Sequence, residues 1–215
     1  MDPEIEIINK MTTVEKVKNF IQKNKKFLII GVCSIIVLVI SFFIYIEFKK
    51  NKKIELSEKY NSVLIQFKTG QNKEILKKSL IKIINEKDKT YSPLSLYFII
   101  DNNLLDSNED INKYFDIIIS IGSLEKEIKN LILYKKALFN SEFASEDNLL
   151  KILNPVINSD STWKSHSLYL MAEYFFSKNE MQKSREFFEK IANLEISNSN
   201  IKLEAQKRLN RDFSE

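Results

Sequence analysis

An uninterrupted apolar block near the N-terminus constrains this chain more than any other feature of its sequence. Residues Phe27 to Ile46 read FLIIGVCSIIVLVISFFIYI, twenty residues without a charge, of which fifteen are Ile, Leu, Val or Phe. A helix of this length spans about 30 Å, the thickness of the hydrocarbon core of a bilayer, and its side chains favour insertion into lipid. We therefore predict a transmembrane helix over residues 27–46, with membrane lipid as its first partner.

Two other uses of the block fit less well. A cleaved signal peptide has a shorter apolar core and a small-residue cleavage site, whereas here the chain runs on as SFFIYIEFKK. The single cysteine, Cys33, follows Val32 instead of a small residue, which argues against a lipidated cysteine. Because Cys33 lies inside the block, the rest of the chain can form neither an internal disulfide nor a cysteine metal site.

Lysines flank the block on both sides, so charge alone does not orient it. Five lie just before the block and five just after it: Lys16, Lys18, Lys23, Lys25 and Lys26, then Lys49, Lys50, Lys52, Lys53 and Lys59. Long domains cross a membrane largely regardless of charge. The short arm of residues 1–26 therefore favours a cytoplasmic N-terminus, with the long C-terminal part on the far side.

The arm itself has an apolar side at helical spacing. Its members are Ile7, Ile8, Met11, Val14, Val17, Phe20 and Ile21. Such an amphipathic helix either lies on the inner leaflet or docks on a cytoplasmic loop of a partner.

About 165 residues follow the block, the size of one ordinary domain. The whole chain has only three Gly and three Pro, too few for the many tight turns of a sandwich or barrel. An all-α fold is predicted. The 33 basic and 29 acidic residues are interspersed and give a net charge of +4, so no field typical of a nucleic-acid-binding protein arises.

Start and stop signals predict roughly eight helices after the span. An apolar-periodic run from Ile54 ends at Gly70, and a second helix is expected from about Asn72 to Glu86. Ser92 before Pro93 is typical of a cap followed by a first-turn proline, and further runs follow Ser123 and Asn179. We assign residues 47–90 to membrane-proximal helices and residues 91–215 to repeats.

Three short polar turns suggest those repeats. SNED at 107–110, SED at 145–147 and KNE at 178–180 are spaced by about 34 to 37 residues, the period of a tetratricopeptide-type helix-turn-helix unit. The last unit matches that pattern of large, small and aromatic residues best: Leu168, Met171, Ala172, Phe175, Ser184, Phe188 and Ile191.

Two earlier units are more degenerate. The middle one comprises Leu133, Tyr134, Ala137, Leu149, Leu150 and Leu153, and the first comprises Leu96, Ile99, Ile100, Tyr114 and Ile118. The small pair Ala172 and Ser184 is expected to let two helices approach closely. The same amphipathic pattern also fits an unrelated helical bundle.

The sequence has little of the chemistry that catalysis needs. His166 is the only histidine, with no second residue to complete a metal or nucleophile site, and no phosphate-binding glycine loop is present. Carboxylates such as Glu186 and Glu189 alternate with Lys183 and Arg185 as helix-face ion pairs do. We expect a non-enzymatic chain with no catalytic, cofactor-binding or metal-binding residues.

The order of these features resembles a known family, the ancillary subunits of the bacterial SecYEG translocon. The resemblance is strongest in VEKVKNFIQKNKKFLIIGV at Val14 to Val32, and a lysine-rich helix, a Tyr-Ser-Pro helix and a terminal KNE turn follow in the family's order. It implies a single-pass inner-membrane protein whose periplasmic tetratricopeptide-like domain associates with the translocon and with periplasmic chaperones during protein export.

Two other functions remain open at this point. A membrane-anchored scaffold for envelope assembly or cell division could use the same domain for different partners. A membrane-tethered enzyme would need a cluster of polar residues, which the sequence does not reveal. The residues of the binding surface and the oligomeric state do not follow from the sequence.

Overall fold

Helices account for every secondary-structure element of the computed structural model, which describes residues 3–195 and 198–213, with side chains from residue 13 onward. Within this part of the chain there are ten α-helices and no strand, so the predicted all-α class is confirmed. By internal contacts the chain divides into two units, residues 1–55 and residues 56–215.

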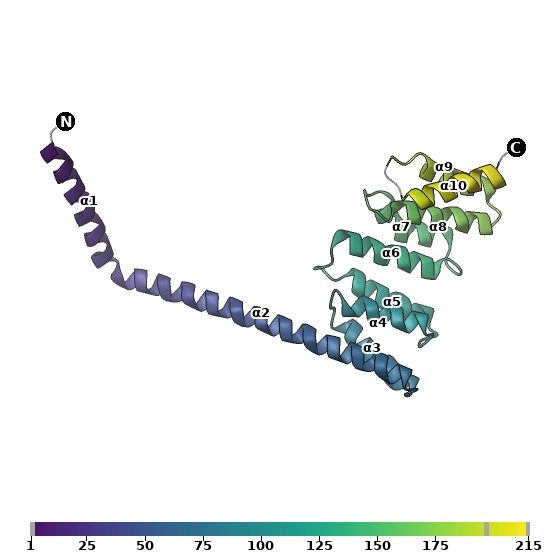
Figure 1. Ribbon diagram of the computed structural model, residues 1–215, viewed down its shortest axis with the longest axis horizontal. Coiled ribbons are helices and arrows are strands. Elements are labelled where there is room, and N and C mark those ends of the chain that lie inside the picture. Colours follow the sequence, from purple (N-terminus) through teal and green to yellow (C-terminus); the bar gives the residue numbers. More distant parts are fainter. Residues whose placement is uncertain (1–2, 196–197, 214–215) are drawn as a thin grey trace. The chain divides into compact units, whose positions relative to one another are not determined.

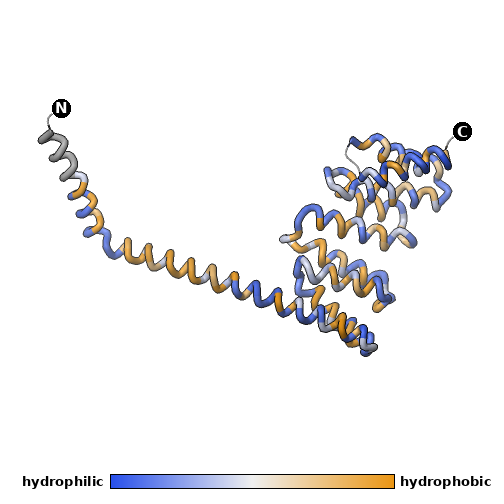
Figure 2. The backbone as a smooth tube through the Cα atoms, in the orientation of Figure 1, coloured by the Kyte–Doolittle hydropathy of each residue, from blue (hydrophilic) through white to orange (hydrophobic). Residues whose placement is uncertain are grey.

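The first unit contains α1 (Pro3–Lys23) and the start of α2 (Lys25–Lys68), shown in Figure 1. Asn24 separates the two helices, and its side-chain amide donates a hydrogen bond to the carbonyl of Phe20, at 3.0 Å. The N-terminal half of α2 is a continuous hydrophobic stretch in Figure 2. It is long and apolar enough to span a membrane, and none of its apolar window is buried inside the protein.

The amphipathic arm belongs to α1. Val14, Val17, Phe20 and Ile21 are all exposed. The side chains of Ile7, Ile8 and Met11 lie outside the described residues.

Helix α2 does not end where the apolar block gives way to polar residues. α2 continues past Ile46 and buries Leu56 and Val63 in the second unit before it ends at Lys68. Gly70 follows with φ +78°, a left-handed conformation that glycine adopts without steric cost, and its amide donates to the carbonyl of Phe67. The stop predicted at Gly70 is confirmed.

Eight helices follow α2 in the described part of the chain. The sequence predicted roughly eight after the span. They are α3 (Lys73–Asn85), α4 (Tyr91–Asp101), α5 (Asn108–Ile119), α6 (Lys126–Asn140), α7 (Glu146–Ile157), α8 (Lys164–Ser177), α9 (Met181–Ala192) and α10 (Ser199–Asp212). From α3 onward each helix packs on the next, and alternate helices also touch: α3 with α5, α6 with α8, and α8 with α10.

The polar turns predicted from the sequence do connect helices. Ser107 and Ser145 accept hydrogen bonds from the amides of Asp110 and Asn148 and so cap α5 and α7. The runs expected after Ser123 and Asn179 begin at Lys126 and Met181.

The cap predicted at Ser92 is wrong. Ser92 lies inside α4, is fully buried, and donates to the carbonyl of Ile83 on α3 at 3.0 Å. The carboxylate of Asp88 instead accepts from the amides of Thr90 and Tyr91, both at 2.8 Å, at the start of the helix. Pro93 is therefore the third helical residue rather than the first.

The core consists of three consecutive clusters. The first spans α2 to α6, the second joins α6, α7 and α8, and the third joins α8, α9 and α10. All seven residues assigned to the last unit are buried, as predicted. In the earlier units Leu96, Ile99, Ile118, Ala137, Leu149 and Leu153 are buried, whereas Ile100, Tyr114, Leu133, Tyr134 and Leu150 are only half-buried.

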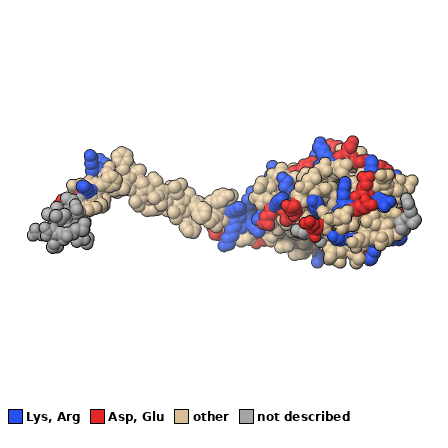
Figure 3. Space-filling model, turned by 90° about the horizontal axis from the view of Figure 1, so that it is seen from above, with Lys and Arg blue, Asp and Glu red and all other residues tan. Residues whose placement is uncertain are grey.

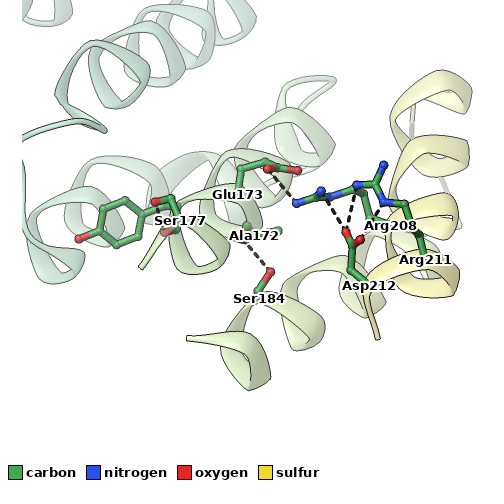
Figure 4. Close-up of polar contacts among 8 residues, drawn as sticks. Ala172, Glu173, Ser177, Ser184, Arg208, Arg211 and Asp212 are labelled. Atoms are coloured by element: carbon green, nitrogen blue, oxygen red, sulfur yellow. Dashed lines mark hydrogen bonds and ion pairs between the residues drawn. The ribbon is translucent and has the colours of Figure 1, made fainter. Parts of the chain in front are cut away.

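The small pair joins α8 to α9. Ala172 and Ser184 are both fully buried, and the Ser184 hydroxyl donates to the carbonyl of Ala172 at 2.9 Å (Figure 4). A hydroxyl that reaches the backbone of the facing helix fixes the spacing of α8 and α9. Larger residues at either position would push the two helices apart.

Ala172→Arg should therefore unfold the C-terminal helices. The substitution forces a long charged side chain between Leu168, Phe188 and Ile191, at an expected cost of about 4 kcal/mol or more. Thermal unfolding of the full chain in detergent, followed by circular dichroism, measures the effect. Gln182→Arg on the exposed side of α9 is the matched control, and equal melting curves for the two variants would contradict the packing described.

Candidate interaction surface

Contacts between alternate helices define one face of the second unit. Lys135 on α6 lies over the ring of Tyr97 on α4, with 5.0 Å between the ammonium nitrogen and the ring centroid. Tyr134 on α6 stacks on Trp163 at the start of α8, and Arg208 on α10 reaches Glu173 on α8. We call this surface the α4–α10 face. Its members are Tyr97, Tyr134, Lys135, Leu138, Trp163, His166, Tyr169, Glu173, Phe176 and Arg208.

Helical spacing brings these residues to one side. Tyr134 and Leu138 are four residues apart on α6, and Tyr169, Glu173 and Phe176 recur at intervals of four and three on α8. Leu138 is 46% exposed although it is a large apolar residue. Aromatic and aliphatic side chains at the surface between helices provide the contact area that protein interfaces use.

Three aromatic rings form the centre of the α4–α10 face. The rings of Tyr134 and Trp163 are stacked with centroids 5.6 Å apart, and the imidazole of His166 lies 5.0 Å from Trp163 and 5.9 Å from Tyr134. The Nδ1 atom of His166 is buried without a hydrogen-bond partner in the described part of the chain. His166 is half-buried among rings.

Arg208 closes the C-terminal end of the face, as Figure 4 shows. Its guanidinium lies 4.2 Å from the ring centroid of Phe176 and forms ion pairs with Glu173 at 3.1 Å and Asp212 at 3.0 Å. The Arg208 side chain is only 12% exposed. A cation so far removed from water needs its charge balanced, and the two carboxylates supply that balance. The network holds α10 against α8.

The tyrosines of the face are neutral well above physiological pH. Burial raises the pKa of Tyr97 to about 12, and burial together with the neighbouring Glu173 carboxylate raises the pKa of Tyr169 to about 12. Burial also raises the pKa of Tyr134. Their hydroxyls therefore act as uncharged groups, and none is activated as a nucleophile or base.

A groove of about 650 Å³ lies outside this face, over α5, α6 and α7. At its centre the side-chain amides of Asn112 and Asn140 each donate to the other's oxygen, both at 2.9 Å. Lys136 donates to the carboxylate of Asp116 at 2.6 Å, and Phe143 at the rim is 50% exposed. The polar groups of the groove are thus largely paired with one another.

Neither surface gathers metal ligands. Among the described residues no group of three or more His, Cys, Asp or Glu side chains is placed to hold a metal ion. Sequence reasoning left the binding residues unassigned. The signal that could have identified the α4–α10 face is the row of aromatic residues on the first helices of successive units, with Tyr97, Tyr134 and Tyr169 as its members.

Tyr97→Phe tests the environment of this row. The Tyr97 hydroxyl is buried without a partner in the described residues, so its removal should leave the free energy of unfolding unchanged or raise it at neutral pH. The folded chain holds this proton up to about pH 12, whereas the ordinary pKa is 10.0. Between about pH 10 and pH 12 the unfolded chain loses this proton while the folded chain keeps it. The free energy of unfolding of the parent chain is therefore unaffected by the ionisation of Tyr97 below pH 10 and falls as pH rises through 12. The melting temperature of Tyr97→Phe should therefore fall less steeply than that of the parent chain over this interval.

Tyr169→Phe provides the comparison. It removes a hydroxyl that interacts with Glu173, so it should lower the melting temperature at neutral pH while it also flattens the alkaline decline. If the melting temperatures of both variants fell with rising alkaline pH as steeply as that of the parent chain, neither phenol would be shielded as described.

Comparison with known proteins adds no further assignment. No protein-family model, no curated protein and no solved structure matches this chain.

Proposed function

We propose that this chain is a single-span membrane protein that uses a tetratricopeptide-like domain to bind other proteins during protein export. The observation that carries the proposal is α2. One helix contains both an exposed apolar window long enough to cross a bilayer and the residues Leu56 and Val63 that are buried in the helical stack. A chain built in this way tethers its domain to a membrane.

The tetratricopeptide-like character rests on three features of the stack. The pairs α4/α5, α6/α7 and α8/α9 are each joined by one of the three polar turns. The first helices of the second and third pairs touch, α6 with α8, and α8 also touches α10. The small residues Ala172 and Ser184 meet within the last pair. Stacked hairpins of this kind expose one long face, which repeat proteins use to bind segments of other proteins.

The α4–α10 face supports a binding function rather than a catalytic one. It offers stacked aromatic rings, neutral phenols and the exposed Leu138, all suited to apolar contact with a partner. Two of its charged groups, Glu173 and Arg208, are already paired with each other. We propose a non-enzymatic role without a cofactor.

The partners follow from the resemblance to ancillary SecYEG translocon subunits, carried by Val14 to Val32 and by the order of the later helices. On this proposal the N-terminal arm lies in the cytoplasm, and the helical domain lies in the periplasm beside the translocon and periplasmic chaperones. The α4–α10 face then contacts those proteins or the chains they handle.

Site-specific photocrosslinking in intact cells tests this proposal. A photoreactive residue at Leu138 should capture translocon subunits or periplasmic chaperones, because Leu138 is the exposed apolar residue of the α4–α10 face. The same residue at Gln182, exposed on α9 and outside that face, should capture them far less. Protease added to spheroplasts of the same strains should digest the helical domain.

Two results would contradict the proposal. A helical domain protected from protease in spheroplasts would place it in the cytoplasm. Capture from Leu138 of division or cell-wall proteins, with no translocon subunit or chaperone, would favour a scaffold for envelope assembly or cell division instead.

A further inference from the structure

The lysines that follow the apolar block share one side of α2. Their positions, all exposed, are Lys49, Lys50, Lys52 and Lys53, and we call this set the basic face. At about 100° per residue the four positions fall within a sector of roughly 160°. By the same spacing the acidic residues of this stretch, Glu47, Glu55 and Glu58, fall in the remaining part of the helix circumference, each about 60° or more from the nearest of the four lysines. The two signs of charge are therefore segregated around α2.

The basic face also lies at the depth of lipid headgroups. At about 1.5 Å rise per residue, Lys49 to Lys53 lie roughly 5 to 10 Å beyond Ile46, the last residue of the apolar block. The headgroup layer on each side of a bilayer is about 5 to 8 Å thick. Figure 3 shows basic side chains gathered where the uncharged part of the helix ends. Flexible lysine side chains at this depth reach the phosphate level.

The ion pair of Lys50 leaves its ammonium group accessible. Lys50 is paired with Glu47 at 4.0 Å, but the Lys50 side chain is still 65% exposed. A long contact between two exposed groups is weak in water and does not exclude a phosphate oxygen.

The lysines at the other end of the apolar block are arranged differently. Lys23 ends α1 and Lys25 begins α2, with the break at Asn24 between them, so they do not share one helix face. The segregated arrangement is particular to the C-terminal end of the block.

We propose that the basic face binds the phosphate groups of anionic phospholipids where α2 leaves the bilayer. The proposal rests on the membrane anchorage proposed above. Each lysine near an anionic membrane surface strengthens the binding of a protein to that surface by about fivefold. Four lysines on one side of the helix select anionic lipids on that side, whereas the acidic side repels them. The chain then holds a patch of anionic lipid beside its domain.

Lipid selectivity of the full chain tests this inference. The chain is reconstituted in phosphatidylcholine bilayers with a trace of spin-labelled phosphatidylglycerol or spin-labelled phosphatidylcholine. The fraction of motionally restricted lipid, read by electron paramagnetic resonance, gives the relative affinity for the two labels. The parent chain should prefer phosphatidylglycerol by about fivefold or more, and high salt should reduce the preference.

Three sets of substitutions sharpen the result. K49Q/K50Q/K52Q/K53Q should lower the preference several-fold, because glutamine keeps the helix but removes the charge. The corresponding Arg variant should retain the preference. K68Q/K73Q/K78Q/K82Q changes net charge equally at exposed positions away from the apolar block and should leave the preference unchanged.

The contrary outcomes are distinct. If the parent chain restricted both labelled lipids with equal affinity, the inference would be overturned and the anchorage left intact. The same holds if the preference for phosphatidylglycerol were unchanged in K49Q/K50Q/K52Q/K53Q. Release of the chain from membranes by alkaline carbonate, with no restricted lipid of either kind, would overturn both the inference and the anchorage.

Discussion

The unbroken backbone hydrogen bonding of α2 is the constraint on which the rest of the structure depends. Peptide groups left unpaired in hydrocarbon are costly, and a helix pairs them within the segment itself. The same helix continues past Ile46 without an end, changes from apolar to charged side chains, and then buries Leu56 and Val63. Leu56 and Val63 begin the packing of the second unit, so the helix that carries the apolar window also starts the helical stack.

Packing then proceeds from neighbour to neighbour. Every helix from α3 onward rests on the next, and the three core clusters follow one another along the chain. Most contacts of such an arrangement join residues close in sequence, which costs little loop entropy to form. The ends of the stack are the vulnerable points. At the C-terminal end Arg208, held between a ring and two carboxylates, keeps α10 in place.

The sequence predicted those parts of the fold that depend on local pattern. The apolar block, the stop at Gly70, the polar turns and the buried set around Ala172 all follow from composition or periodicity. Ser92 was assigned wrongly because its hydroxyl is used by a neighbouring helix, which no local signal reveals. Phe115, fully buried, was absent from the predicted first unit because the periodicity of α5 admits more than one register. The sequence offers the row Tyr97, Tyr134 and Tyr169 as a signal of the α4–α10 face. The contacts within that face could not be predicted, since they depend on which helices lie side by side.

The paired amides of Asn112 and Asn140 fix how α5 is aligned along α6. Each amide donates one hydrogen to its partner and the other to a backbone carbonyl, of Asn108 and of Lys136 respectively, so both have used all their donors. A slide of α5 along α6 by one residue would break both mutual bonds at once, and no apolar contact at that position would resist sliding as sharply. The pair therefore acts as a positional lock between the N-terminal and C-terminal halves of the stack, setting the height at which the later helices continue the earlier ones.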